Sequence, residues 1–374
     1  MALKVMTIVG TRPELIKLCR VIAELDRCTR HVLVHTGQNF DYELNGIFFD
    51  ELNIRSPDHF LNTAGANLGE TLGNVLARSY QVLESERPDA LLLLGDTNSC
   101  LSAISAKRLK IPVFHMEAGN RCFDERVPEE INRRIVDHTS DINLPYTEHA
   151  RRYLLAEGLS PEKVIKTGSP MKEVIGHYLP KIERSDVLAR LELSVDGYFV
   201  VSAHREENVD SDRNLSDLLK TLKTLADKFQ LPVIVSTHPR TRKRLESVGA
   251  KLDDSRVRFL KPLGFPDYVK LQMSARCVLS DSGTITEESS ILGFSAVTIR
   301  QTHERPEGMD EGTLIMCGLE APSVVEAVEV TTTQRAAGRR PQIVADYDVD
   351  NVSTKVVRII LSYTDFVNRR VWMK

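Results

Sequence analysis

Short apolar runs alternate with longer amphipathic segments along most of the chain, and this alternation is the strongest constraint on its fold. Five runs in the first half predict strands, at residues 5–9, 31–35, 90–94, 112–115 and 142–144. Five runs in the second half repeat the rhythm, at residues 198–202, 233–236, 257–260, 277–280 and 296–299. Helical periodicity fills most of the intervals. Repeated β-α-β units of this kind predict parallel sheets joined by right-handed crossovers.

The length of the chain and a pause in this rhythm predict two domains. The chain has 374 residues, more than a single hydrophobic core usually organises. A polar stretch at 181–197 separates the two series of strands and is the natural hinge. We therefore predict an α/β protein of two Rossmann-like domains, residues 1–180 and 181–374, with parallel sheets facing across a cleft. The amphipathic segment 352–372 is expected to be a helix that can pack back on the first domain.

The composition excludes several classes of protein. Hydrophobic residues make up 42% of the chain and charged residues 27%, a balance typical of globular proteins. The formal net charge of −3 gives no general attraction to nucleic acid. No apolar run approaches the roughly 18 residues of a membrane span. The six cysteines include no C-x-x-C pair, which favours a reducing compartment, so we predict a cytoplasmic protein.

Polar clusters follow the predicted strands, at the carboxyl ends where open α/β sheets bind ligands. GTRPE (10–14) follows the first strand, and its Arg12 can reach an anion beside a helix N-terminus. GDTN (95–98) follows the most apolar strand, where apolar walls can raise the pKa of Asp96 and make it a base. When each cluster is taken alone, an ordinary strand-to-helix turn explains the first as well as an anion site does. A helix N-cap explains the second better than a catalytic base does.

Carboxylates are concentrated after the strand at 112–115. Glu117 follows that strand directly, and Glu129 and Glu130 fall in the first turn of the next predicted helix. Compensation of the helix dipole explains one acid in that turn. It does not explain Glu117 together with Arg121 after a separate strand, so we interpret this region as a source of acids and bases.

The loops of the second half carry cations and a phosphate-binding pattern. Ser282 and Gly283 precede a predicted helix whose free N–H groups would bind a phosphate. Histidines and arginines also follow the neighbouring strands, at His204, Arg205, His238, Arg240 and Arg305. A lone histidine in such a loop usually forms only local hydrogen bonds, but this number of cations favours an anion-binding site.

Three other chemistries lack their sequence patterns. No G-x-G-x-x-G follows a strand, which argues against NAD. The spacing of His204, His238, Asp96 and Glu117 matches no metal site, and the G-x-S-x-G of many serine hydrolases is absent. We therefore expect no cofactor and no metal.

Seven segments together resemble the non-hydrolysing UDP-N-acetylglucosamine 2-epimerase family. They are GTRPE (10–14), GDT (95–97), EAGNR (117–121), PEEINR (128–133), HREEN (204–208), SDSGTITEE (280–288) and ERPE (304–307). The resemblance spans nearly the full length, and the order and spacing of the segments are more specific than any one of them. It implies a glycosyltransferase-B-like fold, a homodimer and an isomerase. The implied reaction inverts C2 of a UDP-2-acetamidohexose, by elimination of UDP to a 2-acetamidoglycal and re-addition.

The resemblance also implies roles for individual residues. Proton transfer and charge stabilisation would fall to Asp96, Glu117, Glu129 and His204. The diphosphate would be bound by Arg12, Ser282, Gly283 and Arg305, the ribose by Glu288, and the uracil would lie near Tyr268. Further substrate contacts would come from Lys17, Arg133 and His238. Which carboxylate serves which face of C2 stays open.

Departures from the common family pattern bear on the substrate. Asn120 and Glu206 replace residues of EAGLR and HRREN, and the segment 36–44 lacks a Gln-His pair that contributes to a regulatory substrate site in some relatives. The segments 95–101 and 346–369 resemble a branch that converts UDP-2-acetamido-2,6-dideoxy-L-talose to UDP-N-acetyl-L-fucosamine for capsule or O-antigen synthesis. We predict that reaction. The alternatives are conversion of UDP-N-acetylglucosamine to UDP-N-acetylmannosamine, a glycosyltransferase of the same fold, and a non-catalytic sensor of nucleotide sugars.

Overall fold

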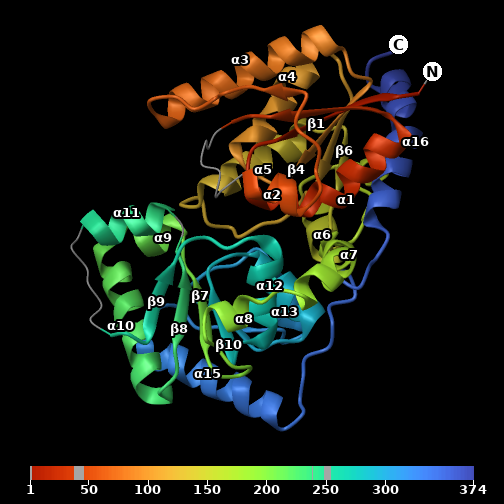
Figure 1. Cartoon of the computed structure of the whole chain (residues 1–374). Helices are drawn as coiled ribbons and strands as arrows, with labels where there is room; N and C mark the ends of the chain where they lie inside the picture. Colours follow the sequence, from red (N-terminus) through yellow and green to blue (C-terminus); the bar gives the residue numbers. More distant parts are fainter. Residues whose placement is uncertain (1, 38–45, 238, 248–253) are drawn as a thin grey trace. The chain divides into compact units, whose positions relative to one another are not determined.

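A computed structural model describes residues 2–37, 46–237, 239–247 and 254–374 (Figure 1). The chain forms two compact units, one of Met1–Gly176 with Ala345–Lys374 and one of His177–Val344. Each unit contains a six-stranded sheet with parallel pairing, which confirms the predicted α/β class. Residues 345–374, which follow the second series of strands in sequence, thus belong to the first unit.

The sheet of the first unit has the strand order β3-β2-β1-β4-β5-β6. Its strands are β1 (Lys4–Val9), β2 (Arg30–His35), β3 (His59–Phe60), β4 (Ala90–Leu94), β5 (Val113–Met116) and β6 (Ile142–Leu144). All five residues of β4 are buried, as expected for a central parallel strand covered on both faces. The strand order reverses between β1 and β4, and ligands of such sheets bind beyond the carboxyl ends at that point.

Helices of the first unit connect these strands. They are α1 (Arg12–Cys28), α2 (Gly46–Glu51), α3 (Leu68–Glu86), α4 (Ser102–Arg108), α5 (Pro128–Thr139), α6 (Glu148–Ala156), the first part of α7 (Met171–Glu183) and α16 (Val352–Arg370). Pro13 stands in the first turn of α1, where its missing N–H leaves no hydrogen bond unmade. The last helix, α16, packs against α1, as Figure 1 shows.

The second unit repeats the same strand order. Its sheet reads β9-β8-β7-β10-β11-β12 from one edge to the other. The strands are β7 (Phe199–Ser202), β8 (Val233–Ser236), β9 (Val257–Leu260), β10 (Cys277–Ser280), β11 (Ala296–Thr298) and β12 (Ile315–Met316). In both units the first strand therefore pairs with the second and the fourth, which makes β7 the counterpart of β1 and β10 the counterpart of β4.

The helices of the second unit alternate with its strands. They are α8 (Val187–Arg190), α9 (Glu206–Val209), α10 (Asp212–Phe229), α11 (Pro239–Ser247), α12 (Phe265–Ser274), α13 (Thr284–Leu292), α14 (Pro306–Asp310) and α15 (Ala321–Ala336). The core between α10, α15 and one face of the sheet is apolar, with Leu222, Val233 and Val328 among its buried side chains.

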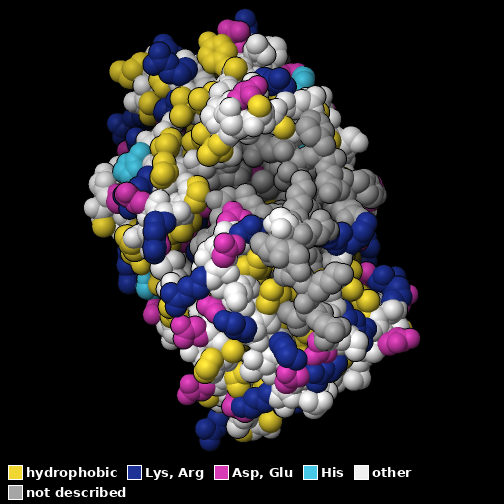
Figure 2. All heavy atoms as spheres, turned by 90° about the vertical axis from the view of Figure 1, so that its left-hand side faces the viewer, with side chains coloured by type: hydrophobic (Ala, Val, Ile, Leu, Met, Phe, Trp, Pro, Cys, Tyr) yellow, Lys and Arg dark blue, Asp and Glu magenta, His cyan; other side chains and the backbone are white. Residues whose placement is uncertain are grey.

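All ten predicted strands are present with bounds close to those expected, whereas β3 and β12 were not predicted. Within the described ranges, no helix has both the length and the apolar character of a membrane-spanning segment. Basic and acidic side chains are interspersed on the face that Figure 2 shows. A mixed surface of this kind agrees with the small net charge and gives no extended basic patch on that face.

Candidate functional site

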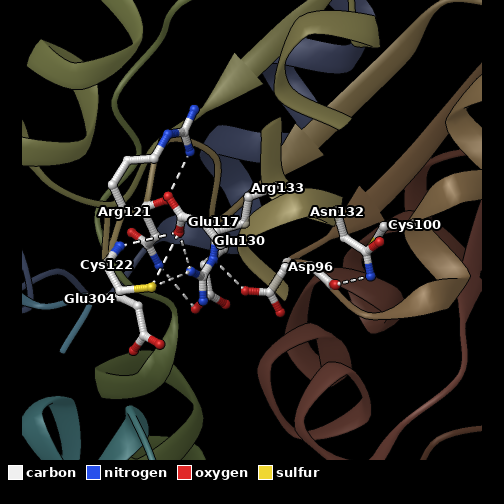
Figure 3. Close-up of polar contacts among 12 residues, drawn as sticks. Asp96, Cys100, Glu117, Arg121, Cys122, Glu130, Asn132, Arg133 and Glu304 are labelled. Carbon is white, nitrogen blue, oxygen red and sulfur yellow. Dashed lines mark hydrogen bonds and ion pairs between the residues drawn. The ribbon is translucent and has the colours of Figure 1, made fainter. Parts of the chain in front are cut away.

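The first unit gathers charged side chains at the carboxyl ends of β1, β4 and β5. Asp96 follows β4, and its carboxylate Oδ2 lies 2.6 Å from Nε of Arg133, which comes from the second turn of α5. The backbone carbonyl of Asp96 accepts a hydrogen bond of 2.9 Å from Asn132 Nδ2 (Figure 3). Residues of α5 therefore fix both the side chain and the backbone of Asp96.

A second ion pair joins Lys17 and Glu117. Lys17 Nζ of α1 lies 2.6 Å from Glu117 Oε2, and the two side chains are only 5% and 11% exposed. Glu117 has φ of 61°, in the left-handed region that a side chain other than glycine rarely adopts. Strain of this kind is found where the surrounding structure holds a functional group in place. The loop after β5 thus directs the Glu117 carboxylate toward α1.

The two glutamates at the start of α5 differ in their surroundings. Glu130 is buried, and its Oε2 lies 2.9 Å from Arg133 Nη1. Glu129 is half-buried and has no side-chain hydrogen bond or ion pair with another described residue. Of these two acids, Glu129 therefore keeps its carboxylate available for a proton transfer, whereas Glu130 holds the arginine.

Sequence reasoning missed several charged residues beneath this cluster. The Arg121 guanidinium, interpreted with Glu117 above, binds Asp137 at 2.7 Å and Glu157 at 2.6 Å instead. His115 and Asp137 form a further buried pair, with 2.9 Å between Nδ1 and Oδ1. The only sequence signal for Asp137 is its spacing of four residues from Arg133, which puts both on one face of α5.

Glu14 is the buried acid of the loop after β1. It accepts hydrogen bonds from Gly10 N at 3.0 Å, Thr11 Oγ1 at 2.8 Å and Ser99 Oγ at 2.5 Å. Burial raises the pKa of Glu14 to about 7, although these hydrogen bonds favour the carboxylate form. Glu14 therefore links the loop that carries Arg12 to the loop that carries Asp96.

In the second unit, Asp281 organises the loop after β7. The carboxylate is completely buried, and its Oδ2 accepts hydrogen bonds from the backbone N–H groups of His204 and Arg205 and from Asn208 Nδ2. His204 Nδ1 lies 3.0 Å from Asp281 Oδ1, while its side chain is 31% exposed. Burial opposes ionisation, but His204 and these hydrogen bonds hold the pKa of Asp281 well below its usual range. Asp281 thus orients His204, which keeps an accessible edge.

The start of α13 carries two hydroxyl side chains on either side of a glycine. Ser282 Oγ and Thr284 Oγ1 lie 3.0 Å apart, and Gly283 immediately precedes the helix. A Cβ atom added to Gly283 would lie 3.4 Å from Glu304 Oε2 and 3.9 Å from Arg305 Nε, so the backbone of Gly283 lies close to both of these side chains. The structure therefore brings Ser282, Gly283 and Arg305 together, the three residues of this unit that were predicted to bind the diphosphate.

Arg305 also pairs with an acid of α13, and two more predicted binding residues lie nearby in sequence or fold. Arg305 is buried, and its Nη2 is 3.0 Å from Glu287 Oε2. Glu288, also in α13, accepts a hydrogen bond of 2.6 Å from Gln272 Nε2 of α12. Tyr268 lies on α12 and packs against the apolar core under β10. The elements α12 and α13 thus carry the residues expected at the ribose and the uracil.

Of two other predicted binding residues, only Arg12 lies within the described part of the chain. Arg12 belongs to the first unit, where its guanidinium lies 5.6 Å from the centre of the Phe48 ring. His238 lies outside the described residues, as does most of the segment 36–44.

Comparison with known proteins gives consistent matches. The family model described as UDP-N-acetylglucosamine 2-epimerase matches residues 23–361. The UDP-N-acetylglucosamine 2-epimerase of Methanocaldococcus jannaschii is 34% identical over 348 residues, which cover 91% of this chain and 95% of that protein. The UDP-2,3-diacetamido-2,3-dideoxy-D-glucuronate 2-epimerase of Pseudomonas aeruginosa is 33% identical, with 88% and 92% covered.

Solved structures of related proteins also match this chain over nearly its full length. The structure of a UDP-N-acetylglucosamine 2-epimerase from Rickettsia bellii is 55% identical, with a TM-score of 0.92 and all of both chains covered. The M. jannaschii enzyme in complex with UDP-GlcNAc and UDP is 32% identical, with a TM-score of 0.90 and coverage of 96% and 100%.

Proposed function

Because the chain belongs to the UDP-N-acetylglucosamine 2-epimerase family, we propose that it inverts C2 of a UDP-2-acetamido sugar by eliminating and re-adding UDP. The chain is an isomerase that acts on a carbohydrate, as its relatives are. The observation that carries the proposal is the pairing of two carboxylates with two cations, Asp96 with Arg133 and Glu117 with Lys17, at one end of the first sheet.

The proposed reaction needs two proton-transfer groups and support for a leaving group. In the first step a base removes the C2 proton while the bond between C1 and the diphosphate oxygen breaks, which leaves a C1=C2 double bond and free UDP. In the second step an acid protonates C2 on the other face and the diphosphate oxygen adds back to C1. Asp96, Glu117 and Glu129 supply carboxylates for these transfers, each contributing on the order of 10²–10⁴-fold.

The C2 proton of such a sugar is not acidic, so stabilising the departing diphosphate contributes much of the catalysis. We assign this work to the start of α13, with Ser282 and Gly283, and to the guanidinium of Arg305. His204, held by Asp281, adds a further cation when protonated. Arg12 and His238 are assigned to the same substrate, Glu288 to its ribose and Tyr268 to its uracil.

The narrower proposal is that the substrate is UDP-2-acetamido-2,6-dideoxy-L-talose and the product UDP-N-acetyl-L-fucosamine, for capsule or O-antigen lipopolysaccharide. The segments 95–101 and 346–369 support it, because they resemble that branch of the family. The second candidate is conversion of UDP-N-acetylglucosamine to UDP-N-acetylmannosamine, which the names of the M. jannaschii and R. bellii proteins favour.

NMR of each UDP-sugar incubated separately with the purified chain tests both levels of the proposal. The narrower proposal predicts faster turnover of the L-talose compound, and faster turnover of UDP-N-acetylglucosamine would replace it with the second candidate. Turnover of neither compound without an added acceptor, together with sugar transfer to an acceptor, would establish a glycosyltransferase. Binding of both compounds without any turnover would establish a sensor.

A further inference from the structure

His115 is a fully buried histidine with an acceptor at each ring nitrogen. It lies on β5, two residues before Glu117. Its Nδ1 is 2.9 Å from Asp137 Oδ1 of α5, and its Nε2 is 2.6 Å from the backbone carbonyl oxygen of Gly95. A carbonyl oxygen can only accept a hydrogen bond, and so can an ionised carboxylate. Both ring nitrogens must then carry a proton, and the ring is an imidazolium.

The other contacts of Asp137 require it to be the acceptor. Gly119 N lies 3.2 Å from Oδ1 and 3.1 Å from Oδ2, and Arg121 Nη1 lies 2.7 Å from Oδ2. These groups can only donate. Asp137 is therefore held as an ionised carboxylate between the arginine and His115, and the buried positive and negative charges compensate one another.

The charged groups near His115 come from a helix and two loops. Asp137 faces it from α5, Asp96 acts on it from the loop after β4, and Arg121 lies beyond Asp137 on the loop after β5. Burial opposes the charged form of the ring. The hydrogen bond and charge of Asp137, the Gly95 carbonyl and the charge of Asp96 outweigh burial and raise the pKa of His115.

The contact with Gly95 connects this buried cation to the candidate site. Gly95 donates its N–H to the Met116 carbonyl at 2.9 Å and has φ of 77°, so its conformation is fixed on both sides. The next residue is Asp96, whose carboxylate binds Arg133. Arg133 and Asp137 stand four residues apart on α5, so the contacts form a closed circuit from Gly95 through His115 and α5 back to Asp96.

We propose that His115 is a constitutively protonated positioning residue, which fixes the Gly95–Asp96 peptide and thereby orients the Asp96 carboxylate toward the substrate. The role in orienting Asp96 rests on the epimerase function proposed above, whereas the protonation state of His115 does not. The ring touches no reacting atom.

NMR of the unmodified protein with ¹³C-labelled histidine rings tests the protonation state without any substrate. One of the 10 histidines should keep imidazolium chemical shifts from pH 6 to pH 8. That signal should disappear in His115→Gln and survive in His204→Gln, which removes the histidine paired with Asp281. Absence of any imidazolium signal at pH 8, or its loss in His204→Gln alone, would overturn the proposal. Even if His115→Gln does not fold, the absence of an imidazolium signal at pH 8 in the unmodified protein, or its loss in His204→Gln, overturns the first point.

Steady-state kinetics on the preferred UDP-sugar test the positioning role. Because a displaced catalytic group can cost on the order of 100-fold, His115→Gln should lower kcat by about that factor and leave KM within about twofold. The matched control is His138→Gln, which changes the half-exposed histidine of α5 that binds Glu157 and should keep full activity. An unchanged kcat in folded His115→Gln would overturn the role. Lack of turnover in the unmodified protein would instead contradict the proposed function, and the NMR result would stand.

Discussion

The two units share one strand order but use the same position differently. In each unit an aspartate follows the fourth strand of that order, Asp96 after β4 and Asp281 after β10. The Asp96 side chain is 23% exposed and pairs with Arg133. Asp281 is completely buried and accepts hydrogen bonds from backbone N–H groups and from Asn208. The topology supplies the position of the acid, and the neighbouring elements decide whether it stays partly exposed or organises a loop.

The largest expected effect is on Asp96, because it is assigned to the chemical step. Asp96→Asn keeps the shape of the side chain but cannot accept a proton. It should lower kcat by about 10²–10⁴-fold and leave UDP affinity unchanged. Turnover by NMR and titration calorimetry with UDP measure the two quantities. Full activity in Asp96→Asn would remove the distinction between the two aspartates.

The contributions of the two buried acids, Glu14 in the first unit and Asp281 in the second, to the free energy of unfolding should change with pH in opposite directions. The pKa of Glu14 is raised to about 7, so the folded state binds its proton more tightly than the unfolded state does. Stability from this group is complete below its unfolded pKa and is lost as the pH rises through 7. The free energy of unfolding of Glu14→Gln, relative to that of the unmodified chain, should therefore rise by up to about 3 kcal/mol between pH 4.5 and pH 8.

Denaturation followed by tryptophan fluorescence measures this change within the first unit, because the single tryptophan, Trp372, lies there. Asp281→Asn is the contrasting variant, and its denaturation is followed by circular dichroism because Asp281 lies in the second unit, which has no tryptophan. The pKa of Asp281 is lowered, so its contribution is present above its unfolded pKa and is lost as the pH falls toward its folded value. Equal pH dependence of the two variants relative to the unmodified chain would contradict the contrast between the buried acids.

Arg305 tests the assignment of the diphosphate to the second unit. Arg305→Ala should weaken UDP binding by about 1.5–3 kcal/mol, the usual contribution of a hydrogen bond to a charged group. Arg335→Ala is the matched control, since that arginine of the same unit binds Asp196. Calorimetry with UDP should show no change for the control, and a melting curve should show that both variants are folded. Unchanged affinity in Arg305→Ala would place the diphosphate elsewhere.

The smallest expected effect separates buried from exposed ion pairs. Lys228 and Glu329 of the second unit lie 2.6 Å apart, the same distance as Lys17 and Glu117, but their side chains are 44% and 48% exposed. A double-mutant cycle on the free energy of unfolding should give a coupling below about 1 kcal/mol for the exposed pair, because solvent screens it. A larger coupling would show that burial does not distinguish the two pairs.

Much of the fold follows from local sequence pattern. The run 90–94 is apolar throughout and forms β4, while Pro13 and Pro128 stand in the first turns of α1 and α5 as expected. The strands β3 and β12 were missed because two residues carry no recognisable periodicity. The position of α16 beside α1 depends on packing between distant segments, which an amphipathic pattern alone does not specify.

The candidate site was less accessible to sequence reasoning. The loops that carry Asp96 and Glu117 were identified because they follow predicted strands. Their cationic partners, Lys17 and Arg133, came only from the family resemblance, since each lies on a helix distant in sequence. Arg121 was grouped with Glu117 because the two are close in sequence, yet the chain turns its guanidinium toward Asp137. Which carboxylate Arg121 binds depends on the path of the backbone after β5, and this path includes the left-handed conformation of Glu117.

The central claim is that carboxylates of the first unit transfer a proton at C2. Exchange of the C2 hydrogen with solvent tests this claim most directly. The purified chain is incubated in deuterated water with the UDP-sugar that it turns over, and the sugar is examined by NMR and mass spectrometry. Elimination and re-addition predict deuterium at C2 of the epimerised product, with incorporation slowed in Asp96→Asn in parallel with turnover. Product that keeps the original hydrogen at C2 would contradict proton exchange with solvent and the proposed mechanism.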